Sequence, residues 1–155
     1  QVQRLRQIAT AVGASCDTAF IGPRDEPLYV SHIDSEQLNA SLAIARQGSL
    51  HGPSHHGSVV MRRDAYSAVG GYRSEFYFAQ DLDLWSRLAE KGSFAVVDKV
   101  LYQARLEPGS ISGIQTIEQR ELAKLIALAT QARRMGQPEH EYLALAAEIQ
   151  PVKRS

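Results

Sequence analysis

Helix-like and strand-like segments alternate along this chain, and this order limits its fold more than any other feature. Apolar residues recur at the spacing of an α-helix in five segments, at 2–12, 35–47, 81–92, 114–135 and 139–149. Short apolar runs typical of buried strands lie at 16–21, 58–61, 94–97 and 100–104. This order predicts an α/β fold, in which helices pack against a sheet.

The segments between these elements carry turn and capping residues. Asp34 or Ser35 is expected to cap the second helix, and Gly13 is expected to end the first. Asp64 is expected to cap a short helical turn that ends at the glycine pair 70–71. Residues 22–34 and 48–57 are rich in proline, glycine and polar side chains, so both are predicted to be loops.

Composition excludes several classes of protein and partner. The 155 residues include 17 acidic and 17 basic side chains, so charge gives no reason to expect a nucleic acid or an anionic membrane as partner. Cys16 is the single cysteine, which excludes an internal disulfide and a cysteine-based zinc cage. We expect Cys16 to be a buried, small apolar residue. No run of residues has the length and apolar character of a transmembrane segment.

Residues 56–87 carry the densest set of candidate functional residues. An apolar strand, the glycine pair Gly70 and Gly71, and the acidic start of a helix at Asp81 follow one another there. Glycine lets the backbone approach a ligand closely, and a carboxylate at a helix start can face the same cleft. Asp81 is therefore either a catalytic base or a negative charge in the first turn of a helix, which contributes about 0.3–1 kcal/mol.

Asp81 and Asp83 also form an Asp-x-Asp sequence, which in other contexts marks a metal site. On a helix the two carboxylates point about 200° apart, so they cannot bind one ion together.

Four motifs within residues 53–112 resemble one enzyme family. In chain order they are HGSVVMRR, VGGY, QDLDLWSRLAEKG and VLYQARLEPGSIS. They resemble the C-terminal half of the catalytic domain of family 2 glycosyltransferases, which have the GT-A fold. The resemblance implies that residues 1–112 are the C-terminal portion of a GT-A domain without its N-terminal nucleotide-binding part. Residues 113–155 would then be a helical C-terminal extension packed on that domain.

The resemblance also implies a mechanism and a set of site residues. Such an enzyme transfers a sugar from a nucleotide-sugar donor to a glycan or lipid-linked acceptor with inversion, and one carboxylate takes the acceptor proton. By resemblance that base is Asp81. The donor- and acceptor-binding residues are then Gly70, Gly71, Gln80, Trp85, His56 and Arg105. Gln80 stands where the family usually has glutamate, and Glu107 stands where it often has a metal-binding histidine.

Further expectations follow from the resemblance. The full-length enzyme would use Mn²⁺ or Mg²⁺, and Glu107 is a candidate ligand because a carboxylate suits either ion. The chain alone is expected to bind no metal and to be inactive, because the nucleotide-binding segment is missing from it. A cytoplasmic location, peripheral to the membrane, and a homo-oligomer are expected. The main alternative is a non-catalytic assembly module that uses helices 35–47 and 114–135, and a weaker one is a carbohydrate-binding module that uses Trp85 and Tyr72.

Other candidate residues have competing interpretations. His51, His55 and His56 suggest zinc, but their spacing in a loop favours solvation or hydrogen bonding to a neighbouring group. Arg62 and Arg63 suggest phosphate binding, but arginines at a strand end more often form surface ion pairs. Trp85 is as consistent with a core position as with stacking on a sugar.

Overall fold

The structure is a computed structural model that describes residues 1–107 and 116–151. It is an α/β fold with a mixed four-stranded sheet flanked by helices, as the order of segments predicts. The end of the fourth family-like motif, the boundary at 112–113 and the predicted helix start at 114 lie outside the described residues.

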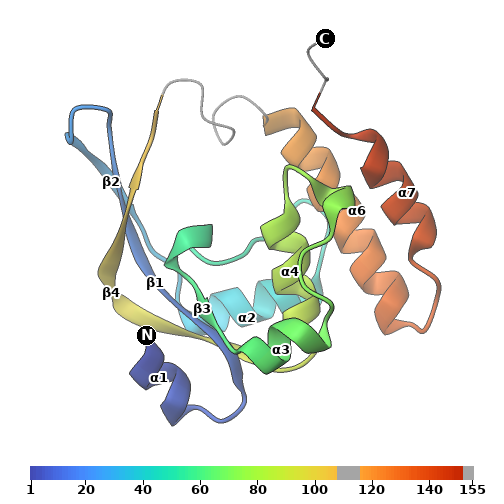
Figure 1. The fold of residues 1–155 in the computed structure, drawn as a ribbon, viewed down its shortest axis with the longest axis horizontal. Helices are drawn as coiled ribbons and strands as arrows, with labels where there is room; N and C mark the ends of the chain where they lie inside the picture. The colour runs from blue at the N-terminus through green and yellow to red at the C-terminus, as the bar shows by residue number, and fades with distance from the viewer. Residues whose placement is uncertain (108–115, 152–155) are drawn as a thin grey trace.

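The sheet is built around β1 (Ala11–Ile21). β4 (Ser93–Arg105) pairs with β1 in parallel along its whole length. The other edge of β1 is shared by β3 (Val60–Met61) and β2 (Pro27–Ser31), both antiparallel to it. β1 is therefore the central strand, and β2 and β4 form opposite edges (Figure 1).

Helices cover the sheet and supply most of the core. They are α1 (Val2–Gln7), α2 (Ser35–Ile44), α3 (Arg63–Ala68), α4 (Gln80–Leu88), α6 (Thr116–Arg134) and α7 (His140–Glu148), with 3₁₀ turns η1 (His56–Ser58) and η2 (Ser74–Phe76). Figure 1 shows α4, α6 and α7 side by side to the right of the sheet. The main core joins Leu42 of α2, Leu84 of α4 and Ile126 of α6 to Phe94 of β4. α6 and α7 thus share one core with the sheet.

The first helix and strand differ from expectation. α1 ends at Gln7 instead of continuing to Val12, and β1 begins at Ala11. Gly13 does not end a helix but lies inside β1, opposite Met61 and Phe94. A Cβ at this position would lie 2.8 Å from Cε1 of Phe94, so glycine is needed to let the Phe94 ring pack against the strand.

Three further strands differ from the sequence-based expectations. Residues 27–31, predicted as loop, form β2, which is stabilised by the stacked rings of Phe20 and Tyr29 with centroids 4.6 Å apart. The strands predicted at 94–97 and 100–104 are one strand, β4, interrupted by an irregularity in its pairing with β1. The strand predicted at 58–61 is confined to Val60–Met61, because His56–Ser58 form η1.

Other expectations are confirmed. The Asp34 carboxylate accepts the N–H of Gln37 at 2.8 Å and caps α2. Cys16 is buried in β1, and burial raises the pKa of its thiol. Within residues 1–107 and 116–151, no helix has both the length and the hydropathy required to span a bilayer.

Candidate functional site

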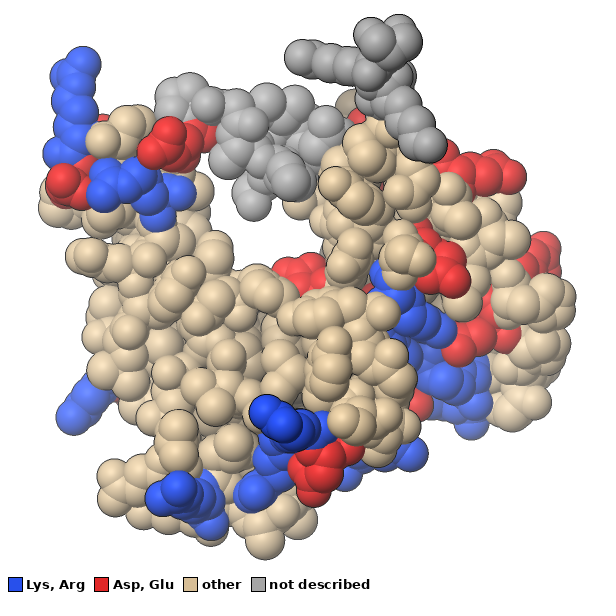
Figure 2. Space-filling model, viewed as in Figure 1, with Lys and Arg blue, Asp and Glu red and all other residues tan. Residues whose placement is uncertain are grey.

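Two adjoining clefts lie at the N-terminal end of α4, and Asp81 lines both. The larger cleft, of about 580 Å³, is bordered by Asp81 and Gln80, by His56 and by the rings of Tyr72 and Tyr77. The smaller, of about 240 Å³, runs toward the loop at Gly52. In the space-filling view a hollow lies between the strands and the helices, with acidic atoms at its margin (Figure 2). Asp81, Gln80 and His56, singled out from the sequence, thus share one cleft.

Asp81 and Asp83 have different environments although they belong to the same helical turn. Asp83 is only 1 % exposed, and its carboxylate accepts hydrogen bonds from Arg73 Nε at 3.0 Å and from Arg87 Nη2 at 2.7 Å. The Asp81 carboxylate accepts the N–H of Leu82 at 2.9 Å and borders the clefts. The two carboxylates therefore do not converge on one ion, as helix geometry predicts.

Aromatic side chains form the wall of the larger cleft beside Asp81. Tyr72 Oη and His56 Nε2 are 3.3 Å apart, and the two rings are tilted with centroids 5.8 Å apart. Burial raises the pKa of Tyr72, and the nearby Tyr66 hydroxyl and Asp81 carboxylate raise it further. Tyr72 is accordingly a neutral hydrogen-bonding group at neutral pH.

Trp85 is a core residue that lies at the border of the smaller cleft. Its side chain is 2 % exposed and packs edge-to-face against Phe94, with centroids 5.8 Å apart. A Cβ at position 52 would lie 2.6 Å from Cδ1 of Trp85, so Gly52 also packs on the indole. Trp85 borders the smaller cleft but cannot offer an open ring face to a sugar.

The glycine pair forms a left-handed turn that is tied to α4. Gly70 and Gly71 have φ of +81° and +71°, a conformation that favours glycine. The Arg87 guanidinium donates to the carbonyls of Val69 and Gly71, each at 2.6 Å. The turn is therefore fixed to the same helix that carries Asp81.

Alanine at Gly71 is expected to destabilise the protein more than alanine at Gly70. Both substitutions incur the left-handed penalty of about 1–2 kcal/mol. A Cβ at Gly71 would also lie 2.7 Å from Oη of Tyr66, whereas a Cβ at Gly70 meets no atom within 4 Å. Urea unfolding of G71A and G70A measures the difference. Equal loss in the two variants would show that Tyr66 moves aside without cost.

Arg105 and Glu107 lie away from this group of residues. The Arg105 guanidinium donates to the carbonyl of Gly22 at 3.0 Å and to the carboxylate of Asp25 at 2.6 Å, so it holds the turn between β1 and β2. Glu107 is exposed just beyond β4. Neither residue borders the clefts at Asp81.

The three loop histidines have separate partners. His51 Nδ1 lies 3.0 Å from Ser41 Oγ, and His55 Nδ1 accepts the N–H of Gly57 at 3.0 Å. The His55 ring stacks on Tyr102, with centroids 5.2 Å apart. No group of three potential metal ligands found in the described part of the chain includes any of them. Hydrogen bonds and a ring contact thus hold His51 and His55 in the loop.

His55 gives the fold a pH dependence with a defined sign. Burial lowers the pKa of His55 and the neighbouring His56 lowers it further, while the Asp81 carboxylate raises it. As pH falls, His55 is protonated more readily in the unfolded chain than in the folded one. The free energy of unfolding that neutral His55 contributes is therefore complete above its unfolded pKa of about 6.5, and it is lost as pH falls below that value. When pH is lowered from about 7.5 to about 5, the free energy of unfolding should fall more for the wild type than for H55Q.

Urea unfolding at a series of pH values checks this, with H140Q as the control because His140 is an exposed residue at the start of α7. An H55Q variant that loses as much stability as the wild type would contradict the assignment to His55.

The two arginines after β3 also have distinct positions. Arg62 Nη2 donates to the carbonyl of Leu5 and Nε to that of Ala11, each at 2.7 Å, so this guanidinium fixes α1 to the sheet. Arg63 is exposed at the start of α3.

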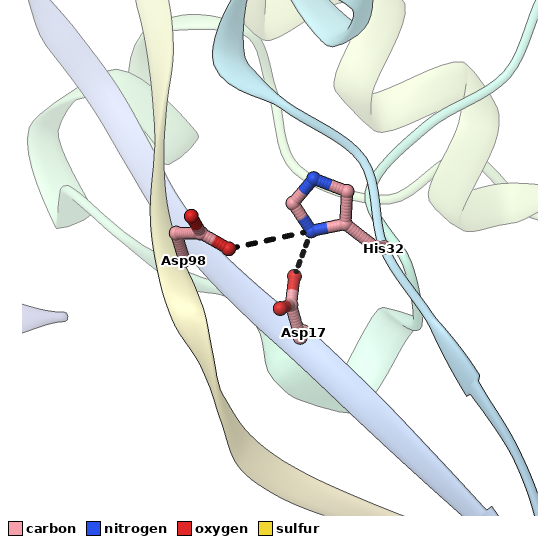
Figure 3. Close-up of side chains that lie close together, drawn as sticks. All are labelled: Asp17, His32 and Asp98. Carbon is pink, nitrogen blue, oxygen red and sulfur yellow. Dashed lines mark hydrogen bonds and ion pairs between the residues drawn. The ribbon is translucent and has the colours of Figure 1, made fainter.

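A second cluster of potential ligand side chains lies on the sheet and was not predicted from the sequence. Asp17 of β1, His32 just after β2 and Asp98 of β4 lie close together (Figure 3). The hydrogen bond from His32 to Asp17 and the charge of Asp17 raise the pKa of His32, with a smaller contribution from Asp98. His32 lies in a segment predicted as loop and Asp98 between two predicted strands, so no local pattern joins them.

Comparison with known proteins gives no family for this chain: no protein-family model and no curated protein matches it.

Proposed function

We propose that this chain carries the acceptor side of an inverting glycosyltransferase site in which Asp81 is the general base. One observation carries the proposal. Of the two carboxylates in the first turn of α4, Asp83 is buried and paired with Arg73 and Arg87, whereas Asp81 borders an open cleft of about 580 Å³. The four motifs that resemble family 2 glycosyltransferases supply the reaction type.

The cleft offers the groups that this chemistry needs. The Asp81 carboxylate accepts the proton of an acceptor hydroxyl while that oxygen bonds to the anomeric carbon and the nucleoside diphosphate leaves. Gln80, His56 and Tyr72 line the same cleft and provide hydrogen-bonding groups for sugar hydroxyls. The ring of Tyr77 provides an apolar surface of the kind on which sugar rings stack.

A divalent metal, which the resemblance implies, finds no suitable site at Glu107. That residue belongs to no group of three potential ligand residues in the described part of the chain. A single exposed carboxylate supplies only one of the several oxygen ligands that Mn²⁺ or Mg²⁺ takes, so Glu107 alone does not form a site. No step proposed here therefore depends on a metal held by Glu107.

The test is a transfer assay on the full-length natural polypeptide. It is incubated with UDP-, GDP- and dTDP-sugars, Mn²⁺ and a panel of glycan acceptors, and release of nucleoside diphosphate is followed. We expect acceptor-dependent release with at least one donor. Release that does not depend on any acceptor, or no release with any donor, would count against the proposal.

The chain of residues 1–155 by itself is expected not to bind UDP and Mn²⁺ with micromolar affinity. The diphosphate needs cationic partners, and among the described residues no lysine or arginine lines the clefts at Asp81. Isothermal titration with UDP and Mn²⁺ measures this. Clear micromolar binding would place the donor site within these residues and would contradict the assignment of only the acceptor side.

A non-catalytic assembly module is the second candidate, and one observation favours it. The edge strand β2 exposes Leu28, Tyr29 and Val30 in succession, and exposed apolar edges attract further strands. The helices first considered for this role instead bury Leu38 and Leu122 in the chain's own core. Assembly would therefore involve the sheet edge, and unchanged transfer after substitution of Asp81 would favour this candidate.

A further inference from the structure

Three potential metal ligands converge at the level where β1, β2 and β4 lie side by side. His32 Nδ1 is 2.8 Å from Asp17 Oδ1 and 3.6 Å from Asp98 Oδ1 (Figure 3). One ligand atom from each residue lies within 4.8 Å of the other two. Ligands around an ion with bonds of about 2.1 Å are about 3.0–3.5 Å apart, so small side-chain rotations bring these atoms to metal-binding distance.

An irregularity in the sheet produces this convergence. Cys16 pairs with Val97, but the next residue, Asp17, pairs with Val100. Asp98 and Lys99 are thus extra residues in β4, and such a bulge re-aims side chains relative to a regular strand. The backbone of β4 is therefore shaped so that Asp98 faces Asp17 and His32 (Figure 3).

The local charges favour a bound cation. Asp17 is 8 % exposed, and in the described part of the chain no lysine or arginine forms an ion pair with Asp17 or Asp98. A carboxylate that is largely removed from water requires a compensating partner, and in the described part of the chain that partner of Asp17 is His32, itself a potential metal ligand. The side chains of His32 and Asp98 are 50 % and 88 % exposed, so an ion and its water ligands have access from one side.

We propose that Asp17, His32 and Asp98 form a binding site for a divalent transition-metal ion, and that Zn²⁺ fits it best. Imidazole and carboxylate together suit zinc, which takes three protein ligands and keeps a further position for water. Mg²⁺ and Ca²⁺ prefer sites made of oxygen ligands alone. The ion joins β1 and β4 to the end of β2. None of its three ligands lines the clefts at Asp81, so the site is independent of the proposed transfer reaction.

The experiment is isothermal titration of the chelator-treated protein with ZnCl₂ at about pH 8, because zinc binding requires an unprotonated histidine. The wild type is expected to bind one ion at this site. H32N and D98N are each expected to weaken that binding at least about tenfold, because removal even of an outer-shell partner has effects of that size. Asp98 is highly exposed, so D98N keeps the fold and gives a result even if another variant does not.

H140N and H51N serve as matched controls, since each removes one histidine from outside the cluster. Both should bind Zn²⁺ as the wild type does. Wild-type protein that binds no Zn²⁺, or H32N and D98N variants with unchanged affinity, would overturn the proposal. Loss of binding in H51N instead would assign the ion to the histidine loop and would also overturn it.

Discussion

Replacement of Asp83 by asparagine is expected to lower the free energy of unfolding by about 3–5 kcal/mol, the typical cost of removing one partner from a buried ion pair. Asp83 is 1 % exposed and accepts hydrogen bonds from both Arg73 and Arg87. Asparagine keeps the shape of the side chain but removes the negative charge. Arg87 would then lie in the interior without its counter-charge, and Arg73 would keep only its ion pair with Glu139.

The loss extends beyond α4 because the ion pairs are connected. Arg73 also pairs with Glu139 at 2.9 Å, and Glu139 pairs with Arg133 near the end of α6. Arg133 pairs in turn with Glu90, just after α4. The network therefore links α4 to α6 and to the start of α7, and D83N weakens this junction as well as the helix itself.

Urea unfolding of D83N measures the effect, with E121Q as the matched control. Glu121 also loses a carboxylate charge from an ion pair, but its pair with Lys124 is half-exposed, and such pairs contribute about 0.5 kcal/mol or less. A D83N variant within about 1 kcal/mol of E121Q would mean that the interior of the network is solvated, in contrast to its burial in the structure.

The sequence predicts the elements whose signals are local. Asp34 caps α2 as its side-chain chemistry indicates, and the apolar spacing of residues 116–134 corresponds to the long helix α6. The failures arise where a distant residue decides the structure. The sequence around Gly13 is typical of a helix end, but its packing against Phe94 requires glycine inside a strand. Residues 27–31 form a strand because they pair with β1.

The candidate site shows the same division. Asp81 and the Gly70 and Gly71 turn are recognisable from the sequence. Asp81 lies in the first turn of α4, and the glycine turn is held by Arg87 in the last turn of the same helix. The spacing of Asp83 and Arg87, four residues apart on a helix, was a local signal that could have identified their ion pair.

The cluster of Asp17, His32 and Asp98 had no such signal. Its members come from three strands or strand ends, and a bulge in β4 brings Asp98 into position. Sequence spacing does not report this kind of convergence, because it depends on the pairing of strands that are distant in the chain.

Replacement of Asp81 by asparagine is expected to reduce transfer by the full-length polypeptide about 10²-fold or more, the range typical of a general base. Asparagine is close in size and can still accept the N–H of Leu82, which the Asp81 carboxylate accepts at 2.9 Å. It cannot take a proton from an acceptor hydroxyl. The loss should therefore appear in kcat, while the free energy of unfolding changes by no more than the helix-charge contribution of about 0.3–1 kcal/mol.

D64N is the matched control for this substitution. The Asp64 carboxylate likewise lies in the first turn of a helix and accepts the N–H of the next residue at 2.9 Å, but it is exposed and borders neither cleft at Asp81. D64N should keep wild-type kcat with a similar small change in stability. If D81N and D64N behave alike in both measurements, Asp81 is only a charge at the start of α4. If D81N alone loses kcat, the carboxylate acts on the substrate, because each substitution makes the same change in the first turn of its own helix.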